Sequence, residues 1–206
     1  MFYDKNKWLK EIVEWIVAFL IAYVIYICIN FFFGTVSGVK QISMYPTAID
    51  GEKVVIQRPT IFKKELKRGM IITFVAPIQT AEKSADDIAV FPDPKGINKF
   101  AYDFLGIGKR SYIKRIIGLP GDRVQVAEDG TVILNGEPLE ESYLNSEKRS
   151  LVGKYMDVIV PENCIFAMGD NRGHSGDSRE FGCIPINKIN GYVITRVWPL
   201  NRLGKI

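Results

Sequence analysis

The chain has 206 residues, which suits one anchored domain with a core of its own rather than several domains. The net charge is only +4, and the lysines and arginines are scattered, so no nucleic-acid-binding stretch is indicated. A small positive charge is compatible with a weak attraction to anionic lipid. One histidine and three dispersed cysteines argue against a metal site built from Cys and His ligands.

An apolar segment at residues 12–33 is the first strong pattern, and lysines at positions 5, 7 and 10 precede it. With its flanks, the uninterrupted core at 15–29 reaches the roughly 20 residues that a helix needs to span a bilayer. The lysines favour a cytoplasmic N-terminus at 1–11, which places residues from 34 onward outside the cell membrane. A cleaved secretory signal is the alternative, but the apolar region of such signals is usually about 7–15 residues long. The sequence therefore predicts a single-pass transmembrane helix at 12–33.

Short strand-like segments alternate with turn signals beyond this helix, which predicts an all-β extracytoplasmic domain over residues 34–206 and a mainly β fold class. Turns are indicated at Asp129-Gly130 and Asn135-Gly136. The polar stretch at 76–110 lacks periodicity and is interpreted as an insertion. The segments with strand character are 53–57, 70–74, 111–117, 123–127, 131–134, 164–168 and 191–198.

Ser43 lies in the stretch Val-Lys-Gln-Ile-Ser-Met-Tyr-Pro-Thr, directly after the predicted anchor. Pro46 fixes φ and lacks an N–H group, so the strand-like segment before it must end in a turn. A serine hydroxyl becomes a nucleophile only beside a base and beside donors for the developing oxyanion. Ser43 is therefore a candidate whose partners must be found elsewhere in the chain.

Two residues could activate Ser43. His174 lies in a Gly-rich polar loop, where a lone histidine is more often solvated than catalytic. Lys114 lies in a predicted strand and shares a face with Tyr112 and Ile116. Desolvation among such neighbours lowers the pKa of a lysine, so that a neutral amine is available near neutral pH. Lys114 is the better candidate for the base.

Four blocks, in order behind one anchor, resemble bacterial type I signal peptidases, the membrane-bound Ser/Lys proteases that cut signal peptides from exported proteins. The small size and the single anchor look most like the Gram-positive forms. The matching blocks are Ser-Met-Tyr-Pro-Thr at 43–47, the strand block at 68–74, the lysine block at 112–122, and Gly-Asp-Asn-Arg with its following loop at 169–179.

The resemblance implies a role for each matched residue. Ser43 is similar to the nucleophile and Lys114 to the general base, and no cofactor is implied. The residues with supporting roles are Ser175, which would hydrogen-bond and orient the lysine amine, the ion pair Asp177–Arg179, and the ion pair Asp170–Arg115. The residues implied to line the substrate pockets are Val39, Met44, Tyr112 and Ile113, and Met44 would also pack beside the dyad.

This sequence departs from the family pattern at two positions. Met70 stands where Asp usually follows Arg-Gly, which we interpret as a structural change only. Gln41 stands where most members have Gly or Ser, two residues before the nucleophile. Its side-chain amide could reach the oxyanion directly, or a backbone N–H could serve while the side chain narrows substrate access. We expect the second arrangement.

The predicted partners are pre-proteins that bear signal peptides, and membrane lipid, with no nucleic acid. The alternative function is a signal-peptidase-like accessory protein for pilin or surface-protein assembly, but a pure binding protein has no reason to retain both Ser43 and Lys114. A peptidase that cuts only a few pre-proteins is a further alternative that the sequence leaves open. A soluble self-cleaving Ser/Lys repressor is opposed by the anchor and by the lack of a DNA-binding segment.

Cys164 and Cys183 could form a disulfide outside the cytoplasm, or pack as free thiols.

Overall fold

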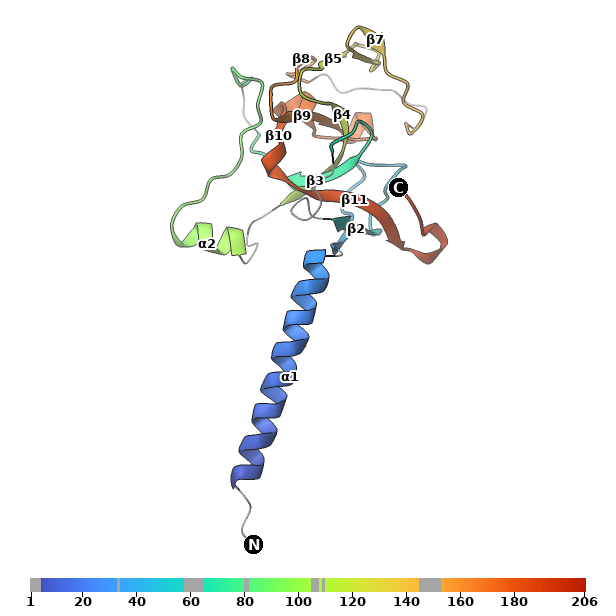
Figure 1. Cartoon of the computed structure of the whole chain (residues 1–206). Coiled ribbons are helices and arrows are strands. Elements are labelled where there is room, and N and C mark those ends of the chain that lie inside the picture. Colours follow the sequence, from blue (N-terminus) through green and yellow to red (C-terminus); the bar gives the residue numbers. More distant parts are fainter. Residues whose placement is uncertain are drawn as a thin grey trace.

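The computed structural model describes residues 5–32, 34–57, 65–79, 82–104, 108, 110–144 and 153–206. A long helix, α1 (Lys5–Phe32), projects from a β domain, and the N-terminus lies at its far end (Figure 1). The helix begins at Lys5, before the predicted start of the apolar segment at Ile12.

Large apolar side chains are exposed along α1, among them Trp15 at 67% and Phe19 at 70%. Within the described part of the chain, no helix combines the length and the apolarity that crossing a membrane requires. The side chains of residues 27–32, inside the predicted anchor, lie outside the described set. The membrane span predicted at 12–33 is therefore not confirmed.

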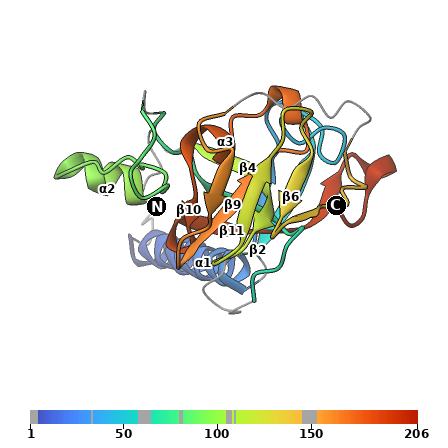
Figure 2. The ribbon, with the colours of Figure 1, turned by 90° about the horizontal axis from the view of Figure 1, so that it is seen from above.

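Two antiparallel sheets form the domain (Figure 2). The larger has seven strands, whose spatial order is β1-β2-β11-β3-β4-β9-β10. These strands are β1 (Thr35–Gly38), β2 (Lys53–Gln57), β3 (Ile71–Val75), β4 (Ser111–Gly118), β9 (Cys164–Met168), β10 (Ile184–Pro185) and β11 (Ile189–Trp198). The smaller has the order β7-β6-β5-β8 and consists of β5 (Arg123–Val126), β6 (Val132–Leu134), β7 (Glu137–Pro138) and β8 (Asp157–Ile159).

Every predicted strand is confirmed to within two residues, because alternating apolar side chains and turn residues mark these strands clearly. The Asn135-Gly136 turn joins β6 to β7 with φ angles of 53° and 91°, the left-handed pair that a tight hairpin requires. The strands without a sequence prediction, β1, β7, β8 and β10, have between two and four residues each. Strands this short carry too few alternations to be recognised.

Two helices depart from the expected all-β domain. α2 (Ile97–Phe104) lies in the 76–110 insertion and stands apart from the sheets in two views (Figures 1 and 2). α3 (Ser178–Phe181) is a single turn in the loop after β9. The remaining helical elements are short 3-10 turns at Arg172–His174, Ile186–Lys188 and Leu200–Arg202.

Among the described residues the core has three clusters: a first between the two sheets, a second beneath the Ser43 turn, and a third built on the large sheet around Ile72, Phe74 and Ile165. The first contains Cys164 and Cys183, which are both buried and free, so the disulfide considered from sequence is not formed. The second consists of Val39, Met44, Ala48, Val54 and Ile71.

Candidate active site

Ser43 lies in a turn that follows the edge strand β1. Inside the turn, Tyr45 N–H donates to the carbonyl of Ile42 at 3.0 Å and Ala48 N–H donates to the carbonyl of Met44 at 2.8 Å. The Met44 side chain is fully buried in the cluster beneath. A buried side chain directly after Ser43 fixes the direction in which the Ser43 side chain projects.

Asn171 holds the same turn from the loop after β9. Its backbone N–H donates to the Ser43 carbonyl at 3.1 Å, and its side-chain amide donates to the Ile42 carbonyl at 3.1 Å. Nothing in the sequence pattern assigned this role to Asn171, since it depends on which loop packs against the turn.

Lys114 approaches Ser43 from β4, which pairs with β3 through Ile72 and Lys114. Its Nζ donates to Ser43 Oγ at 2.7 Å, and both side chains are buried. Nζ also lies 5.3 Å from the centre of the Tyr112 ring, as expected for residues on one face of a strand. The structure therefore brings the two residues of the predicted dyad into direct contact.

The environment of Lys114 sets its proton affinity. Burial lowers the pKa of the amine to about 8, while the negative charge of Asp177 works in the opposite direction. A lysine with this pKa has a substantial neutral fraction at weakly alkaline pH, and that neutral form can accept a proton.

Ser175 is buried close to the dyad, but it does not make the hydrogen bond expected from the resemblance. Its Oγ has no hydrogen-bond partner among the described residues. Gly169 lies between Ser175 and the nucleophile turn, where an added Cβ would come within 2.2 Å of Ser175 Oγ and 2.5 Å of the Ser43 carbonyl oxygen. The close packing of Ser175 beside the turn thus depends on glycine at position 169.

Asp177 and Arg179 form the predicted ion pair, with Nε–Oδ1 and Nη2–Oδ2 distances of 2.8 Å. Asp177 caps α3 by accepting from Arg179 N–H at 3.2 Å, and it also accepts from Gly169 N–H at 2.9 Å. Burial works to raise the pKa of Asp177, but the hydrogen bonds and charge of Arg179 outweigh it and hold that pKa below its ordinary value. The pair fixes the loop that packs against Ser43.

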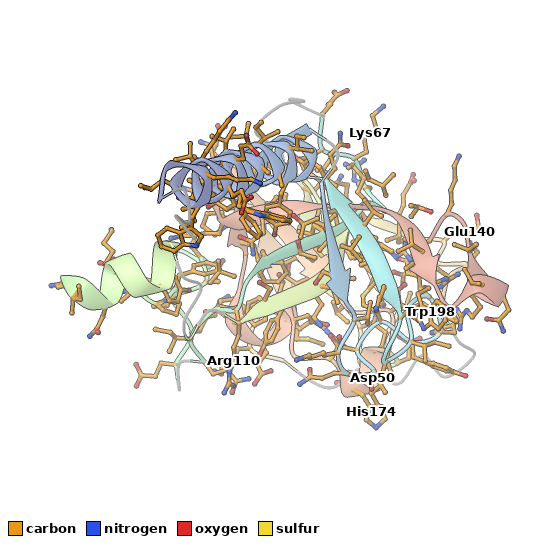
Figure 3. All side chains as sticks on the ribbon, turned by 90° about the horizontal axis from the view of Figure 1, so that it is seen from below. Asp50, Lys67, Arg110, Glu140, His174 and Trp198 are labelled. Atoms are coloured by element: carbon orange, nitrogen blue, oxygen red, sulfur yellow. The ribbon has the colours of Figure 1, made fainter. Side chains whose placement is uncertain are left out.

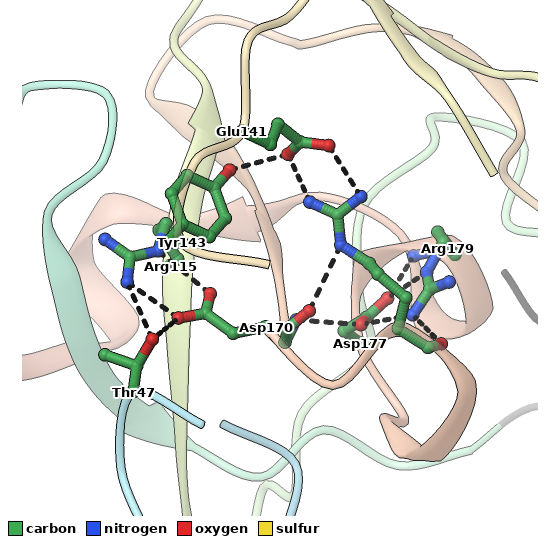
Figure 4. Close-up of polar contacts among 9 residues, drawn as sticks. Thr47, Arg115, Glu141, Tyr143, Asp170, Asp177 and Arg179 are labelled. Carbon is green, nitrogen blue, oxygen red and sulfur yellow. Dashed lines mark hydrogen bonds and ion pairs between the residues drawn. The ribbon is translucent and has the colours of Figure 1, made fainter. Parts of the chain in front are cut away.

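Asp170 and Arg115 form the second predicted pair, at 2.9 and 2.7 Å (Figure 4). Thr47 joins them, because its hydroxyl donates to Asp170. Since Arg115 follows Lys114 on β4 and Thr47 belongs to the Ser43 turn, this group connects the Ser43 turn to the strand that carries Lys114.

Three residues of this network had no predicted role. Arg172 is 2% exposed, donates to the Gly169 carbonyl at 3.2 Å and pairs with Glu141. Tyr143 donates to Glu141 at 2.6 Å, and its ring lies 4.0 Å from the Arg115 guanidinium carbon. Glu141 and Tyr143 lie in an unpatterned segment after β7, so only the folded chain reveals their contacts.

A groove of about 870 Å³ leads to the dyad. Val39, Tyr112 and Ile113 line it, as predicted for substrate-binding residues. Met44 does not line the groove, because its side chain is directed into the core and is 0% exposed.

Gln41 lies at the groove with a φ of 75°, a left-handed conformation that glycine adopts without strain. Its N–H donates to Asp50 Oδ1 at 2.7 Å, so the Gln41 backbone is not free to serve an oxyanion. The N–H of Ser43 has no partner among the described residues. Of these two backbone N–H groups, only that of Ser43 is left without a partner in the described part of the chain.

His174, the other candidate base, is exposed and lies at the periphery of the domain (Figure 3). Its Nδ1 is 3.3 Å from Asn171 Oδ1. Among the described residues it makes no hydrogen bond to Ser43, which has Lys114 as its side-chain partner.

A buried serine in contact with a lysine of lowered pKa, at the end of a groove, is an arrangement suited to acyl transfer. The family model described as signal peptidase, peptidase S26 matches residues 12–198. Signal peptidase IB of Staphylococcus aureus (strain COL) is 30% identical over 207 residues, covering 93% of this chain and 92% of that protein. Signal peptidase I of Leptolyngbya laminosa is 32% identical over 164 residues, covering 80% of this chain and 68% of that protein.

A crystal structure of a signal peptidase I from Enterococcus faecalis V583 shares 28% identity, covers 63% of this chain and 97% of its own, and has a TM-score of 0.39. The family assignment depends on the sequence matches. The chain belongs to the signal peptidase family S26 and is a serine protease of the signal peptidase I type, a class that removes signal peptides from pre-proteins.

Proposed function

We propose that this protein cleaves signal peptides from exported pre-proteins with Ser43 as the nucleophile and Lys114 as the general base. The observation that carries the proposal is the 2.7 Å hydrogen bond between Lys114 Nζ and Ser43 Oγ, made between two buried side chains. The lowered pKa of Lys114 supports it, because only the neutral amine can take the serine proton.

The reaction proceeds in two acyl-transfer steps. Neutral Lys114 takes the proton of Ser43 as Oγ attacks the scissile carbonyl carbon, and the resulting ammonium then protonates the leaving amine of the mature protein. The signal peptide is left as an ester on Ser43. Lys114 next takes a proton from water, whose oxygen attacks the ester, and the proton returns to Ser43 as the signal peptide leaves with a free carboxylate.

The developing oxyanion needs a donor held at the nucleophile. Ser43 N–H is suited to this role, since it belongs to the attacking residue and has no partner among the described residues. Asn171 and the buried Met44 hold the peptide plane in place, so the donor is oriented before the reaction begins.

The groove presents two strand edges to an extended substrate. β1 pairs with β2 on one side, and its other edge has no strand partner in the part of the chain that the structure describes. β4 pairs with β3 over Ser111–Arg115 and with β9 only from Arg115 onward, so among the described residues its edge at 111–114 that faces away from β3 has no strand partner. An extended chain can add to such an edge through main-chain hydrogen bonds, while Val39, Tyr112 and Ile113 contact small side chains near the cleavage site.

We further propose that α1 holds the protein at the cell membrane, with a cytoplasmic N-terminus and an extracytoplasmic β domain. A helix of 28 residues is about 42 Å long, and its described apolar side chains are exposed all along it. Protease added to intact spheroplasts should digest the β domain, and full protection of that domain would contradict this orientation.

The decisive experiment incubates the purified full-length protein, in detergent micelles, with a pre-protein that carries an Ala-x-Ala cleavage site. The wild type should release a mature protein with the expected new N-terminus, and Ser43→Ala should release none. Ser142→Ala, the same change at an exposed serine, is the matched control and should cleave like the wild type. Cleavage by folded Ser43→Ala would refute the proposed nucleophile.

A pilin precursor assayed in parallel tests whether the protein cuts only a narrow set of pre-proteins.

A further inference from the structure

Two arginines from the C-terminal segment contact the turn that carries Ser43. Arg196 Nη1 donates to the carbonyl of Thr47 at 3.0 Å, and Arg202 Nη2 donates to the carbonyl of Pro46 at 3.3 Å. Both carbonyls belong to the turn that begins at the nucleophile. The proposed mechanism assigns no function to these contacts.

Glu52 joins the two arginines at the base of the same loop. It is 3% exposed, and its Oε2 accepts from Arg196 Nη1 at 3.1 Å, while Oε1 lies 3.1 Å from Arg202 Nε. Its backbone carbonyl accepts from Val39 N–H at 2.7 Å, which closes the loop after β1. The carboxylate is held strongly, because losing Glu52 would leave Arg196, whose side chain is 11% exposed, largely desolvated without a counter-charge.

The segment that supplies the arginines is itself hydrogen-bonded to the rest of the domain. Arg196 pairs with Gly204 through backbone hydrogen bonds of 2.8 and 3.2 Å, and its Nε donates to the carbonyl of Arg202 at 2.5 Å. β11 pairs with β2 as far as Trp198, and Trp198 and Asp50 lie toward the same side of the domain (Figure 3). The two guanidinium groups are thus attached to the large sheet rather than to a free tail.

Thr47 links these contacts to the catalytic base. Its carbonyl accepts from Arg196, and its hydroxyl donates to Asp170, the partner of Arg115 on β4. The turn is therefore held from the C-terminal segment and from the strand of Lys114 at once. A nucleophile displaced by about 1 Å can lose about 100-fold in rate, so attachments of this kind bear directly on turnover.

We infer that Glu52, Arg196 and Arg202, here termed the C-terminal clamp, are positioning residues that set the approach of Ser43 Oγ to Lys114 Nζ. The inference rests on the proposed function of Ser43. The C-terminal clamp touches neither reacting atom; it acts through the carbonyls of Pro46 and Thr47.

Arg202→Ala is the most informative variant. The Arg202 side chain is 32% exposed and makes one hydrogen bond to the turn, so its loss should be compatible with folding. Arg202→Lys keeps the positive charge beside Glu52. Arg123→Ala removes an arginine from an exposed pair in the small sheet and is the matched control. All variants are compared as full-length proteins in detergent, below their measured unfolding temperatures.

Arg202→Ala should lower kcat about 10- to 100-fold with KM within about twofold, because ground-state binding is untouched and alignment is lost. Arg202→Lys should recover at least half of the loss in the logarithm of kcat. A purely structural role would lower the unfolding temperature but leave kcat of the folded protein unchanged.

Backbone hydrogen exchange across residues 39–52, measured in the Ser43→Ala background, gives a readout that does not depend on cleavage. Exchange should be faster with Arg202→Ala than with Arg123→Ala. Equal exchange overturns the inference, and so does a kcat for Arg202→Ala within about twofold of the control. A wild type that cleaves nothing would refute the proposed function, while the exchange comparison would still decide the clamp.

Discussion

Two of the aspartate–arginine pairs in this domain have nearly the same hydrogen-bond geometry but lie in different surroundings. Beside the large sheet, Asp177 and Arg179 are joined at 2.8 and 2.8 Å, with 0% and 2% of their side chains exposed. In the small sheet, Arg123 and Asp157 are joined at 2.9 and 2.7 Å, but their side chains are 55% and 48% exposed. The geometry is nearly the same, and the surroundings differ.

The difference shows where the domain concentrates its electrostatic interactions. Around Ser43 and Lys114, four ion pairs are largely removed from water: Asp177–Arg179, Asp170–Arg115, Glu141–Arg172 and Glu52–Arg196. Low dielectric strengthens each pair and makes the loss of one partner costly. The exposed pair of the small sheet is screened by water and salt. The small sheet contributes apolar side chains to the core, whereas the buried pairs hold the turn and the strand that carry Ser43 and Lys114.

The largest expected effect lies in the dyad itself. Lys114→Ala should abolish cleavage, and the double variant with Ser43→Ala should be no worse than either single change, because the two residues act as a unit. His174→Ala should retain most of its activity, since that ring is exposed and faces Asn171. A folded but inactive His174→Ala protein would contradict the Ser/Lys assignment.

Asp177→Asn should lower the free energy of unfolding by roughly 3–5 kcal/mol, because it leaves Arg179 buried without a counter-charge. Asp157→Asn, the same substitution in the exposed pair, should leave the unfolding temperature unchanged. Thermal denaturation at low and high salt measures both. Equal destabilisation of the two variants would remove the distinction drawn between the two regions.

The rate of cleavage should rise with pH through about 8, the pKa to which burial lowers the Lys114 amine. Below that pH the rate should fall about tenfold per unit, since the protonated amine cannot act as a base, and above it the rate should level. Single-turnover rates across this range provide the measurement. A flat profile with chemistry limiting would count against a lysine base.

Gln41→Gly should change turnover by less than about tenfold, because Ser43 N–H remains as a backbone donor for the oxyanion. Glycine also suits the φ of 75° at this position, and a smaller residue at the groove should widen the range of pre-proteins cut. Turnover of Gln41→Gly and Gln41→Ala on one good substrate decides the matter. A fall of about 10²–10³ in both, at unchanged KM, would show that the Gln41 amide is the donor.

The sequence alone was sufficient to predict the longer strands and the residues of the candidate active site. Apolar alternation and turn residues predicted the longer strands. The four blocks that resemble signal peptidases predicted the pairing of Ser43 with Lys114 and the two ion pairs Asp170–Arg115 and Asp177–Arg179, all of which the structure contains. Such predictions succeed because each depends on a short stretch of chain, in which side-chain period and backbone preference act together.

Tertiary structure alone decided how distant segments meet. In the folded chain the Met44 side chain is buried in the core, Ser175 Oγ makes no hydrogen bond to Lys114, and Gln41 N–H donates to Asp50. It also brought Glu141 to Arg172, and Arg196 and Arg202 to the Ser43 turn. These contacts join residues far apart in the chain, and whether a buried polar group finds a partner depends on packing in three dimensions, which no local pattern records.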